Sequence, residues 1–457
     1  MPNIDERLSR LGTAIPEILI PRPGTELEKW AVIACDQYTQ DQEYWHRVQE
    51  RAGSSPSALN LIFPEIYLEN EGRKERIASI HHAMEAYING GTFSPPKKGL
   101  IYIERSTPLH PRRRGLLLAV DLEQYNWQAG SRPLIRATEG TVPERIPPRV
   151  EIRRGAPLES PHIILLIDDE KDSLLSTLGD RAQRAAAPIY ESSLMEESGQ
   201  IRGWFLGDED DWTYLAEGLE DLASAAPARY GTGDAVPFLY AVGDGNHSLA
   251  TAKAVWEEYK QAHAHDSSLM QHPARWALVE LENLYDPGIA FEPIHRIIFG
   301  ASLAEMRDCL SLLPGFSCKP AGDRAELSDL VRSPGPTSTR YGLTDGKNHF
   351  LIESAASGIA TDALQPLLDD FIQKTKACSI DYIHGEDELF RLADPSSGGG
   401  QSSKNGDKKA AGILLPPIKK EDLFKTVAKS GPLPRKSFSM GEAFEKRFYL
   451  ECRRLFG

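Results

Sequence analysis

An acid and an imidazole stand three residues apart in a glycine-rich stretch near the middle of the chain. Asp244 lies between Gly243 and Gly245, and Asn246 and His247 follow. Carboxylates and imidazoles are the side chains that enzymes use most often to accept and donate protons near neutral pH. Glycine also allows a backbone to turn tightly and to approach a ligand closely. This stretch is therefore the first candidate for a functional site.

The residues on either side of this turn predict the elements that position it. The apolar run from Phe238 to Val242 is typical of a short buried strand. After the turn, apolar residues recur at helical spacing at Leu249, Ala252, Val255, Trp256 and Tyr259. Asn246 or Ser248 is the expected N-cap of this helix. A strand, a tight turn and a helix start direct backbone amides and a positive dipole end toward one point, where phosphate binds well.

The spacing excludes two common phosphate-binding motifs. The stretch lacks the Gly-x-x-x-x-Gly-Lys-Ser/Thr pattern of a Walker loop. It also departs from Gly-x-Gly-x-x-Gly, because Gly243 and Gly245 are followed by Ser248 where the third glycine is required. A purely structural role, in which Asp244 only caps the turn, is the alternative that these residues leave open.

A second junction between an expected strand and an expected helix also carries an acid. The run Trp30–Ala34 is predicted as a strand and residues 41–51 as a helix, with Asp36 between them. Asp36 is a candidate metal ligand, and capping of the helix by Thr39 is the structural alternative for this junction.

Two loops rich in basic residues are candidates for binding anions. One contains Arg149 in a Pro-rich segment, and the other contains Arg435, Lys436 and Ser437. Arginine offers paired donors to phosphate or carboxylate, although surface ion pairs would use the same residues. We expect the loop at 433–440 to fold back onto the central turn.

Bulk composition limits the classes of partner. The chain has 457 residues and a formal net charge of −14, which disfavours nucleic acid as a partner. Its five cysteines are widely spaced and odd in number, so they predict neither a disulfide framework nor a structural zinc site. The N-terminus has no signal-peptide pattern and the longest apolar run is too short to span a membrane. We expect a cytoplasmic protein.

The element pattern predicts a mixed α/β (α+β) fold in two domains. The first is expected over residues 1–165, and the second, over residues 166–457, would carry the central turn. Residues 396–409 are predicted to be a flexible loop because they are rich in Gly, Ser and Lys. The last segment, Glu442–Phe456, is predicted as a helix.

Five stretches taken together resemble one family. The chain is similar to the prokaryotic domain-of-unknown-function family numbered 1015, in its longer-chain branch. The residues that carry this resemblance are Trp30–Thr39, Glu139–Thr141 with Arg149, Gly243–His247, Asp381–Glu386 and Leu433–Ser437. The resemblance extends over nearly the whole chain and rests on the order of these segments.

The central motif of that family resembles Asp-Gly-His-His-Arg, a string similar to ParB-like and sulfiredoxin-like nucleotide sites. Free-serine kinases occur among ParB-like proteins, and in them an acid of this motif assists phosphoryl transfer to the serine hydroxyl. In this chain Asp244, Gly245 and His247 match the motif. Asn246 replaces the first histidine and Ser248 the arginine, so a phosphate contact is lost that Arg149 or Arg435 would have to supply.

The resemblance therefore implies a nucleotide-dependent phosphotransferase acting on a small hydroxylated metabolite, with free L-serine as the first candidate. Asp244 would accept the hydroxyl proton, with His247 and Glu139 as the other candidate catalytic residues. ATP or ADP would be bound by Gly243, Gly245, Asn246, Ser248, Arg149, Arg435, Lys436 and Ser437. Mg²⁺ would bridge the nucleotide oxygens through Asp36 or Glu139.

Two other functions remain open at this stage. One is a nucleotide-binding regulatory protein with little or no turnover. The other is a phosphoester hydrolase that uses His247 with a carboxylate. Expected partners are a small-molecule substrate and a nucleotide, without nucleic acid or membrane.

Overall fold

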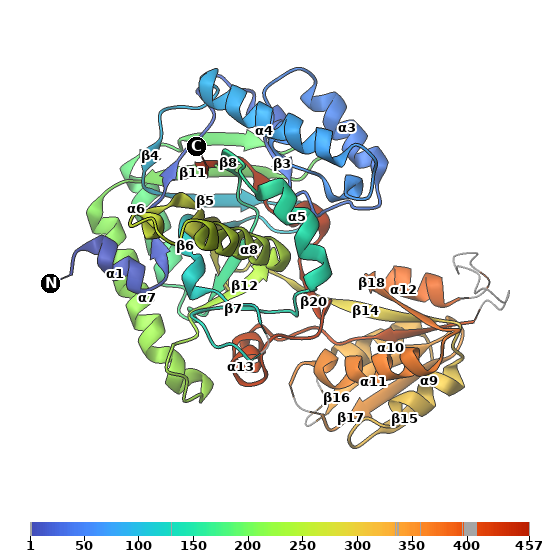
Figure 1. Ribbon diagram of the computed structural model, residues 1–457. Coiled ribbons are helices and arrows are strands. Elements are labelled where there is room, and N and C mark those ends of the chain that lie inside the picture. The colour runs from blue at the N-terminus through green and yellow to red at the C-terminus, as the bar shows by residue number, and fades with distance from the viewer. Residues whose placement is uncertain are drawn as a thin grey trace. The chain divides into compact units, whose positions relative to one another are not determined.

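The computed structural model describes residues 2–128, 130–333, 335, 338–356, 358–394, 396 and 409–456. Most of the predicted flexible loop at 396–409 lies outside the described residues. The chain divides into two compact units (Figure 1). The first unit comprises residues 1–290 and 441–457, and the second comprises residues 291–440.

The first unit is built on a nine-stranded mixed sheet. Eight strands form a continuous order, β10-β11-β5-β6-β13-β9-β12-β7, and β1 (Thr13–Ala14) pairs with β6. Strand β12 runs parallel to β7 and antiparallel to β9. The bounds in spatial order are Tyr190–Ser193, Gln200–Leu206, Leu100–Ser106, Arg113–Asp121, Trp276–Asn283, Ile164–Ile167, Tyr240–Asp244 and Ile135–Ala137.

Both faces of this sheet are covered, which explains why its central strands are apolar at successive positions. On β6, Leu116 and Leu118 enter one hydrophobic core and Leu117 enters the other. The first core contains residues of the helices α1, α6, α7 and α8, and the second contains residues of α3 and α4. These helices span Ile4–Arg10, Leu174–Ala185, Glu209–Tyr230, Asn246–Ala262, Gln42–Ala52 and Arg73–Asn89.

Short elements complete the first unit. The helices α2 (Leu27–Trp30) and α5 (Ile146–Arg153) lie in its connections. The C-terminal segment forms β21 (Phe448–Tyr449) and β22 (Arg453–Arg454) rather than the helix predicted over Glu442–Phe456. Strand β21 pairs with β3 (Val32–Ile33), and β22 pairs with β8 (Leu158–Glu159). Pairing with distant strands has overridden local helix propensity here.

The second unit contains a seven-stranded antiparallel sheet of its own. Six strands follow the order β15-β17-β16-β19-β14-β18, and β20 (Phe438–Met440) pairs with β14. The six span Ser317–Ala321, His349–Ser354, Thr339–Thr344, Ala410–Leu414, Phe291–Phe299 and Ser379–His384. Helices of this unit are α9 (Leu303–Leu310), α10 (Arg324–Arg332), α11 (Ala360–Lys374), α12 (Glu386–Ala393) and α13 (Lys420–Ser430). Residues of α9 and α11 enter one core, and residues of α10 and α12 enter another.

The predicted mixed α/β fold is confirmed. The predicted boundary after residue 165, however, falls inside β9 and does not coincide with the division into units. The reason is that β9 hydrogen-bonds to β12 and β13, which come much later in the chain. Among the described residues no helix combines the length and the apolar character that crossing a membrane requires.

Candidate functional site

The central turn joins β12 to α8. Strand β12 ends at Asp244, and α8 begins at Asn246 after a left-handed Gly245 with φ of 82°. A side chain at Gly245 would be strained, and its Cβ would lie 3.1 Å from the Ile163 side chain. The first intrahelical hydrogen bond is donated by the Leu249 amide to the Gly245 carbonyl. The strand, the turn and the helix that the sequence predicts are thus confirmed. The expected N-cap, Asn246 or Ser248, is wrong: Gly245 is the N-cap, and both of those residues lie in the first turn of α8.

Asp244 is held by a backbone amide and a buried cation. Its Oδ1 accepts a hydrogen bond of 3.0 Å from the Gly245 amide. Its Oδ2 lies 3.3 Å from Nζ of Lys446, whose side chain is only 8% exposed. Lys446 belongs to the C-terminal segment that returns to the first unit. An oriented carboxylate therefore lies beside an ammonium group at the N-terminal end of a helix.

Lys446 also acts on the second predicted acid, Asp36. Burial acts to raise the pKa of Asp36, but His162, the Gln37 amide and Lys446 outweigh it and leave this pKa below its ordinary value. Gln37 Nε2 donates to Asp36 Oδ1 over 2.9 Å. Lys446 thus lies 3.3 Å from Asp244 Oδ2 and also contributes to the lowered pKa of Asp36.

Glu139 and His247 belong to the loop and helix that meet at this corner. Ala137 on β7 pairs with Val242 on the parallel β12, so Glu139 and Asp244 both follow the same edge of the sheet. Thr138 Oγ1 donates to the Val242 carbonyl over 2.5 Å, which fastens the start of the Glu139 loop to the turn.

The same loop is tied to α8 by two further hydrogen bonds. Asn246 Nδ2 donates to Thr138 Oγ1 over 3.4 Å. The Val142 amide donates to His247 Nε2 over 3.2 Å. Because Nε2 accepts this bond, the proton of the neutral His247 ring is on Nδ1. Only Nδ1 of this ring can therefore donate to a phosphate in this arrangement.

Ser248 takes part in a chain of hydrogen bonds that the sequence does not predict. Its Oγ lies 2.7 Å from His162 Nε2, and His162 Nδ1 lies 2.8 Å from the Tyr449 hydroxyl. The Cys35 amide donates to the same hydroxyl over 3.2 Å. Four segments far apart in the sequence are joined by these contacts.

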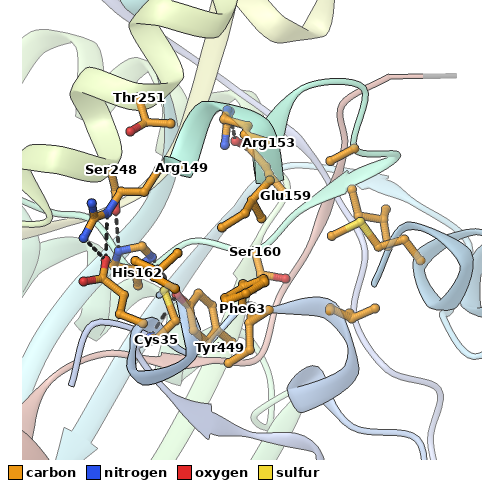
Figure 2. A pocket seen from close by; sticks show the side chains of 18 residues that line it. Cys35, Phe63, Arg149, Arg153, Glu159, Ser160, His162, Ser248, Thr251 and Tyr449 are labelled. Atoms are coloured by element: carbon orange, nitrogen blue, oxygen red, sulfur yellow. Dashed lines mark hydrogen bonds and ion pairs between the residues drawn. The ribbon is translucent and has the colours of Figure 1, made fainter. Parts of the chain in front are cut away.

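A cavity of about 140 Å³ opens beside this chain of hydrogen bonds. Figure 2 shows Arg149, Ser248 and His162 on one side of it and Arg153 with Glu159 on another. Its apolar lining includes Ile62, Phe63, Leu68, Met84, Ile152 and Leu158. The cavity therefore combines an apolar wall with a group of polar side chains.

Arg149 reaches this region but is already paired. Its Nε donates to Glu65 Oε1 over 2.7 Å, and its side chain also donates to the Arg145 carbonyl. Burial, and then Asp36, raise the pKa of Glu65 against the opposing effect of Arg149. A large part of the charge of Arg149 is thus compensated within the protein.

The structure divides the predicted residues between the two units. The first unit holds Asp36, Glu139, Arg149 and the whole stretch from Gly243 to Ser248, whereas Arg435, Lys436 and Ser437 belong to the second unit. Described contacts of the latter group include Arg435 Nε with the Tyr382 hydroxyl at 3.3 Å. Ser437 Oγ lies 2.7 Å from Thr361 Oγ1, and Lys436 is left-handed with φ of 58°. The return of this loop to the central turn stays a prediction.

The described part of the chain contains no group of three or more His, Cys, Asp or Glu side chains placed to hold a metal ion. Mg²⁺ is commonly held by only one or two carboxylates together with substrate phosphates. Asp36 and Glu139 supply oxygen donors of that kind. The role of Asp36 and Glu139 as metal ligands stays a prediction.

Sequence reasoning missed Lys446, His162, Tyr449 and Glu65. Lys446 and Tyr449 lie in the segment predicted as a helix, Glu442–Phe456, which the structure instead pairs with β3 and β8. The run Phe448-Tyr449-Leu450 directly after two basic residues was the one local signal of a buried extended segment. His162 stands between Pro161 and the apolar strand β9, a position that carries no signal of function.

A comparison with protein families identifies the chain. The family model described as "Protein of unknown function (DUF1015)" matches residues 19–363. The chain belongs to this family. The family resemblance inferred from the five sequence segments is therefore confirmed, and the match includes the central turn. No curated protein matches the sequence.

Solved structures similar to this family member share little sequence with it. A conserved hypothetical protein from Pyrococcus furiosus is 10% identical over 74% of this chain and 95% of its own, with a TM-score of 0.36. A free serine kinase in complex with AMP is 10% identical over 74% and 92%, with a TM-score of 0.38. SbnI with a C-terminal truncation from Staphylococcus aureus is 10% identical over 71% and 82%, with a TM-score of 0.34.

Proposed function

We propose that the protein is a nucleotide-dependent phosphotransferase that acts on a small hydroxylated metabolite. The observation that carries the proposal is Asp244, oriented by the Gly245 amide and 3.3 Å from Lys446 at the start of α8. Phosphoryl transfer depends on positioning, on positive charge near the phosphates and on an acid that orients the attacking hydroxyl. These three requirements correspond to the turn, to Lys446 and to Asp244.

The roles follow from the chemistry of each group. The acceptor oxygen forms a bond to the terminal phosphorus of the nucleotide, and the bond from that phosphorus to the bridging oxygen breaks. The hydroxyl proton passes to Asp244. Lys446 and the amides at the start of α8 bind the phosphate oxygens, where a helix dipole favours negative charge. The shortened nucleotide and a phosphomonoester are the products.

His247, Glu139 and Asp36 have supporting roles in this proposal. His247 donates from Nδ1 to a phosphate oxygen, since its Nε2 accepts the Val142 amide. Glu139 and Asp36 are the carboxylates that would hold Mg²⁺ in this proposal, and the ion when bound would neutralise charge on the nucleotide oxygens. Arg149 keeps the α5 region in place through Glu65. ATP or ADP is the donor, and free L-serine is the first acceptor to test.

Phosphorus NMR tests the proposal directly. Purified protein is incubated with Mg²⁺, ATP or ADP and a pool of hydroxylated metabolites that includes L-serine. A new phosphomonoester resonance is expected with the wild type and is expected to fall at least a hundredfold in Asp244→Asn, because that change removes the proton acceptor and keeps the side-chain shape. Asp221→Asn makes the same chemical change on an exposed position of α7 and is expected to keep full turnover.

The other outcomes decide between functions. Nucleotide binding without any new phosphomonoester would support a regulatory protein. Release of inorganic phosphate that does not depend on an acceptor would support a hydrolase. Full turnover by Asp244→Asn would show that Asp244 is not the base that accepts the hydroxyl proton.

A further inference from the structure

One glutamate in the cavity beside Ser248 is shared by two arginines. Glu159 Oε1 accepts a hydrogen bond of 2.8 Å from Arg453 Nε, and it also accepts the Leu278 amide over 2.9 Å. The other oxygen, Oε2, accepts a hydrogen bond from Arg153. Burial acts to raise the pKa of Glu159, but Arg453 and then Arg153 outweigh it and leave this pKa below its ordinary value. Glu159 is therefore an ionised carboxylate that is bonded to two cations.

The two arginines differ in how strongly the protein engages them. Arg453 is buried, donates to Glu159 through two nitrogens, and also donates to two backbone carbonyls over 3.1 and 2.8 Å. Arg153 lines the cavity, and its side chain is 19% exposed. Within the described part of the chain its guanidinium bonds to Glu159 through Nη2, which uses one of five N–H donors. Arg153 is thus the arginine that has donors to offer a ligand.

The charges in and directly behind the lining do not cancel. Arg149 and Glu65 form a pair whose charges sum to zero. Arg153, Arg453 and Glu159 form a group of two positive charges and one negative charge, so one positive charge remains. Of the two arginines in this group, Arg153 is the one that lines the cavity. A ligand group with a single negative charge would balance the site.

A carboxylate fits this site better than a phosphate group does. It carries one negative charge, whereas a phosphomonoester carries about −1.5 to −2 at pH 7. Its two oxygens also match the paired N–H donors of a guanidinium. The cavity measures about 140 Å³, and its lining includes apolar side chains such as Phe63 and Met84. These dimensions and walls suit the short carbon skeleton of a small organic acid.

The charges at the turn indicate which end of such an acid binds at Arg153. Asp244 lies 3.3 Å from Lys446, and the same lysine acts on Asp36. Two carboxylates near one ammonium leave an excess of negative charge there, which repels a third carboxylate. Ser248, in the first turn of α8, borders the cavity on a different side from Arg153 (Figure 2). An acid with its carboxylate at Arg153 can therefore direct its hydroxyl toward the start of α8.

We infer that Arg153 binds the carboxylate of the acceptor, so that the acceptor is a small hydroxylated carboxylic acid. The inference rests on the proposed function only in identifying the ligand as the acceptor substrate. L-serine is one member of this class, and sugars, polyols and other neutral alcohols lie outside it.

Titration calorimetry of the full chain without nucleotide tests the inference with matched pairs of ligands. L-serine, D-glycerate and L-lactate are each compared with the corresponding amide, which replaces the carboxylate by an uncharged group of similar size. At least one of the acids is expected to bind. Its amide is expected to bind at least tenfold more weakly, roughly the effect of losing a hydrogen bond to a charged group.

Two adjacent arginines at the end of α5 supply a variant and its control. Arg153→Gln is expected to weaken binding of the acid at least tenfold and to keep the fold, because Glu159 remains bonded to Arg453. Arg154→Gln removes the next arginine, whose side chain is 56% exposed and lies 2.8 Å from Glu258. This control is expected to bind the acid as the wild type does. Thermal melting of both variants checks their folding.

A second variant keeps the test decisive if Arg153→Gln does not fold. Arg153→Lys keeps a positive charge beside Glu159 but loses the paired donors of the guanidinium. It is expected to bind the acid about threefold more weakly than the wild type, since a lysine ammonium acts only as a point charge.

Four results would overturn the inference: no binding of any of the acids, equal binding of an acid and its amide, wild-type affinity in the folded Arg153 variant, or displacement of the acid by equimolar inorganic phosphate. Its failure is distinct from failure of the proposed function. A phosphomonoester formed from a neutral polyol would keep the phosphotransferase and exclude the acid. Binding of the acid through Arg153 without any phosphomonoester would keep the acid site and exclude the phosphotransfer.

Discussion

At the scale of single residues, Lys446 is the group on which the proposed site depends most. Its buried ammonium lies 3.3 Å from Asp244 Oδ2 and contributes to the lowered pKa of Asp36. A bound phosphate would add further negative charge beside it. A nucleotide therefore needs this cation both for direct attraction and to offset repulsion from two carboxylates.

Substitution Lys446→Gln is expected to weaken binding of ADP or ATP by roughly 10- to 100-fold, the range for losing a hydrogen bond to a charged group. Titration calorimetry with ADP and with ATP measures the affinity of the variant and of the wild type. Lys260→Gln is the control, since Lys260 is also ion-paired, to Glu123 at 2.7 Å, but lies in the last turn of α8. Equal nucleotide affinity in Lys446→Gln and the wild type would show that phosphates bind elsewhere.

At the scale of elements, the turn between β12 and α8 depends on a glycine for two separate reasons. Gly245 has φ of 82°, and a Cβ there would press on Ile163 at 3.1 to 3.4 Å. Gly231, at the C-terminal end of α7, has φ of 63° and open space around it. Both glycines have a left-handed backbone, but only Gly245 has neighbouring atoms close to where a Cβ would lie.

Gly231→Ala is expected to lower the free energy of unfolding by about 1–2 kcal/mol, the usual cost of a left-handed non-glycine residue. Gly245→Ala is expected to cost more and also to reduce turnover, because relief of the contact with Ile163 displaces the turn that holds Asp244. Urea unfolding and the phosphomonoester assay measure the two effects. Equal stability loss and unchanged turnover in both variants would contradict the role of Ile163.

A buried histidine makes the second unit sensitive to acid. Burial, and then Arg296 and His384, lower the pKa of His295 to about 3. Its Nδ1 accepts the Leu415 amide over 3.1 Å, so the neutral ring is the form that the fold uses. In the unfolded chain a histidine takes up its proton near pH 6.5. Between pH 6.5 and about 3 the unfolded state therefore binds more protons, and stability falls as the pH falls.

The expected loss from this one group is at most about 1.4 kcal/mol for each pH unit below 6.5. His295→Asn, whose side-chain oxygen can accept the Leu415 amide, is expected to remove that part of the slope. Urea unfolding at pH 7, 6, 5 and 4, followed by hydrogen exchange of β14 and β19 amides, measures both proteins. Parallel pH profiles for the two would show that His295 does not titrate as its burial implies.

The elements around Asp244 could be predicted from the sequence, but most of the contacts between them could not. The corner at Asp244 is local: an apolar run, a glycine and a helical repeat are contiguous, so its elements could be predicted. The partners of Asp244 and Ser248 are not local. Lys446 and His162 reach the corner only because β3 pairs with β21 and β12 pairs with β9. The helix predicted for the C-terminal segment is wrong. The segment is extended instead, and its Arg447 and Glu451 are buried as an ion pair.

At the scale of the whole molecule, the second unit is a continuous segment inserted into the first. The Gly441 amide donates to the Ala290 carbonyl over 3.0 Å, so the chain returns to the point that it left. A domain boundary of this kind has no linker that composition could reveal. The boundary predicted after residue 165 therefore had no physical counterpart in the sheet pairing.

Residues 441–456 stabilise the first unit, although they follow the second unit in the sequence. Leu450 accepts a hydrogen bond of 2.8 Å from the Trp30 indole, and Phe448 and Leu450 are fully buried. The Glu445 carbonyl accepts from both Arg105 and Arg113, at 2.8 and 2.7 Å. Removing this segment would expose an apolar core and leave buried charges unpaired, and a single broken buried ion pair already costs about 3–5 kcal/mol.

A chain ended after Met440 is therefore expected to lose the fold of the first unit and keep that of the second. A chain in which residues 291–440 are replaced by a short Gly/Ser linker is expected to keep the first unit, because Ala290 and Gly441 are adjacent. Limited proteolysis with mass spectrometry, together with thermal melting, measures both. The truncated chain should yield a protected fragment near 291–440 and the linker chain one cooperative transition. Protection of residues 1–290 from proteolysis in the truncated chain would show that the first unit is stable without the strands β21 and β22.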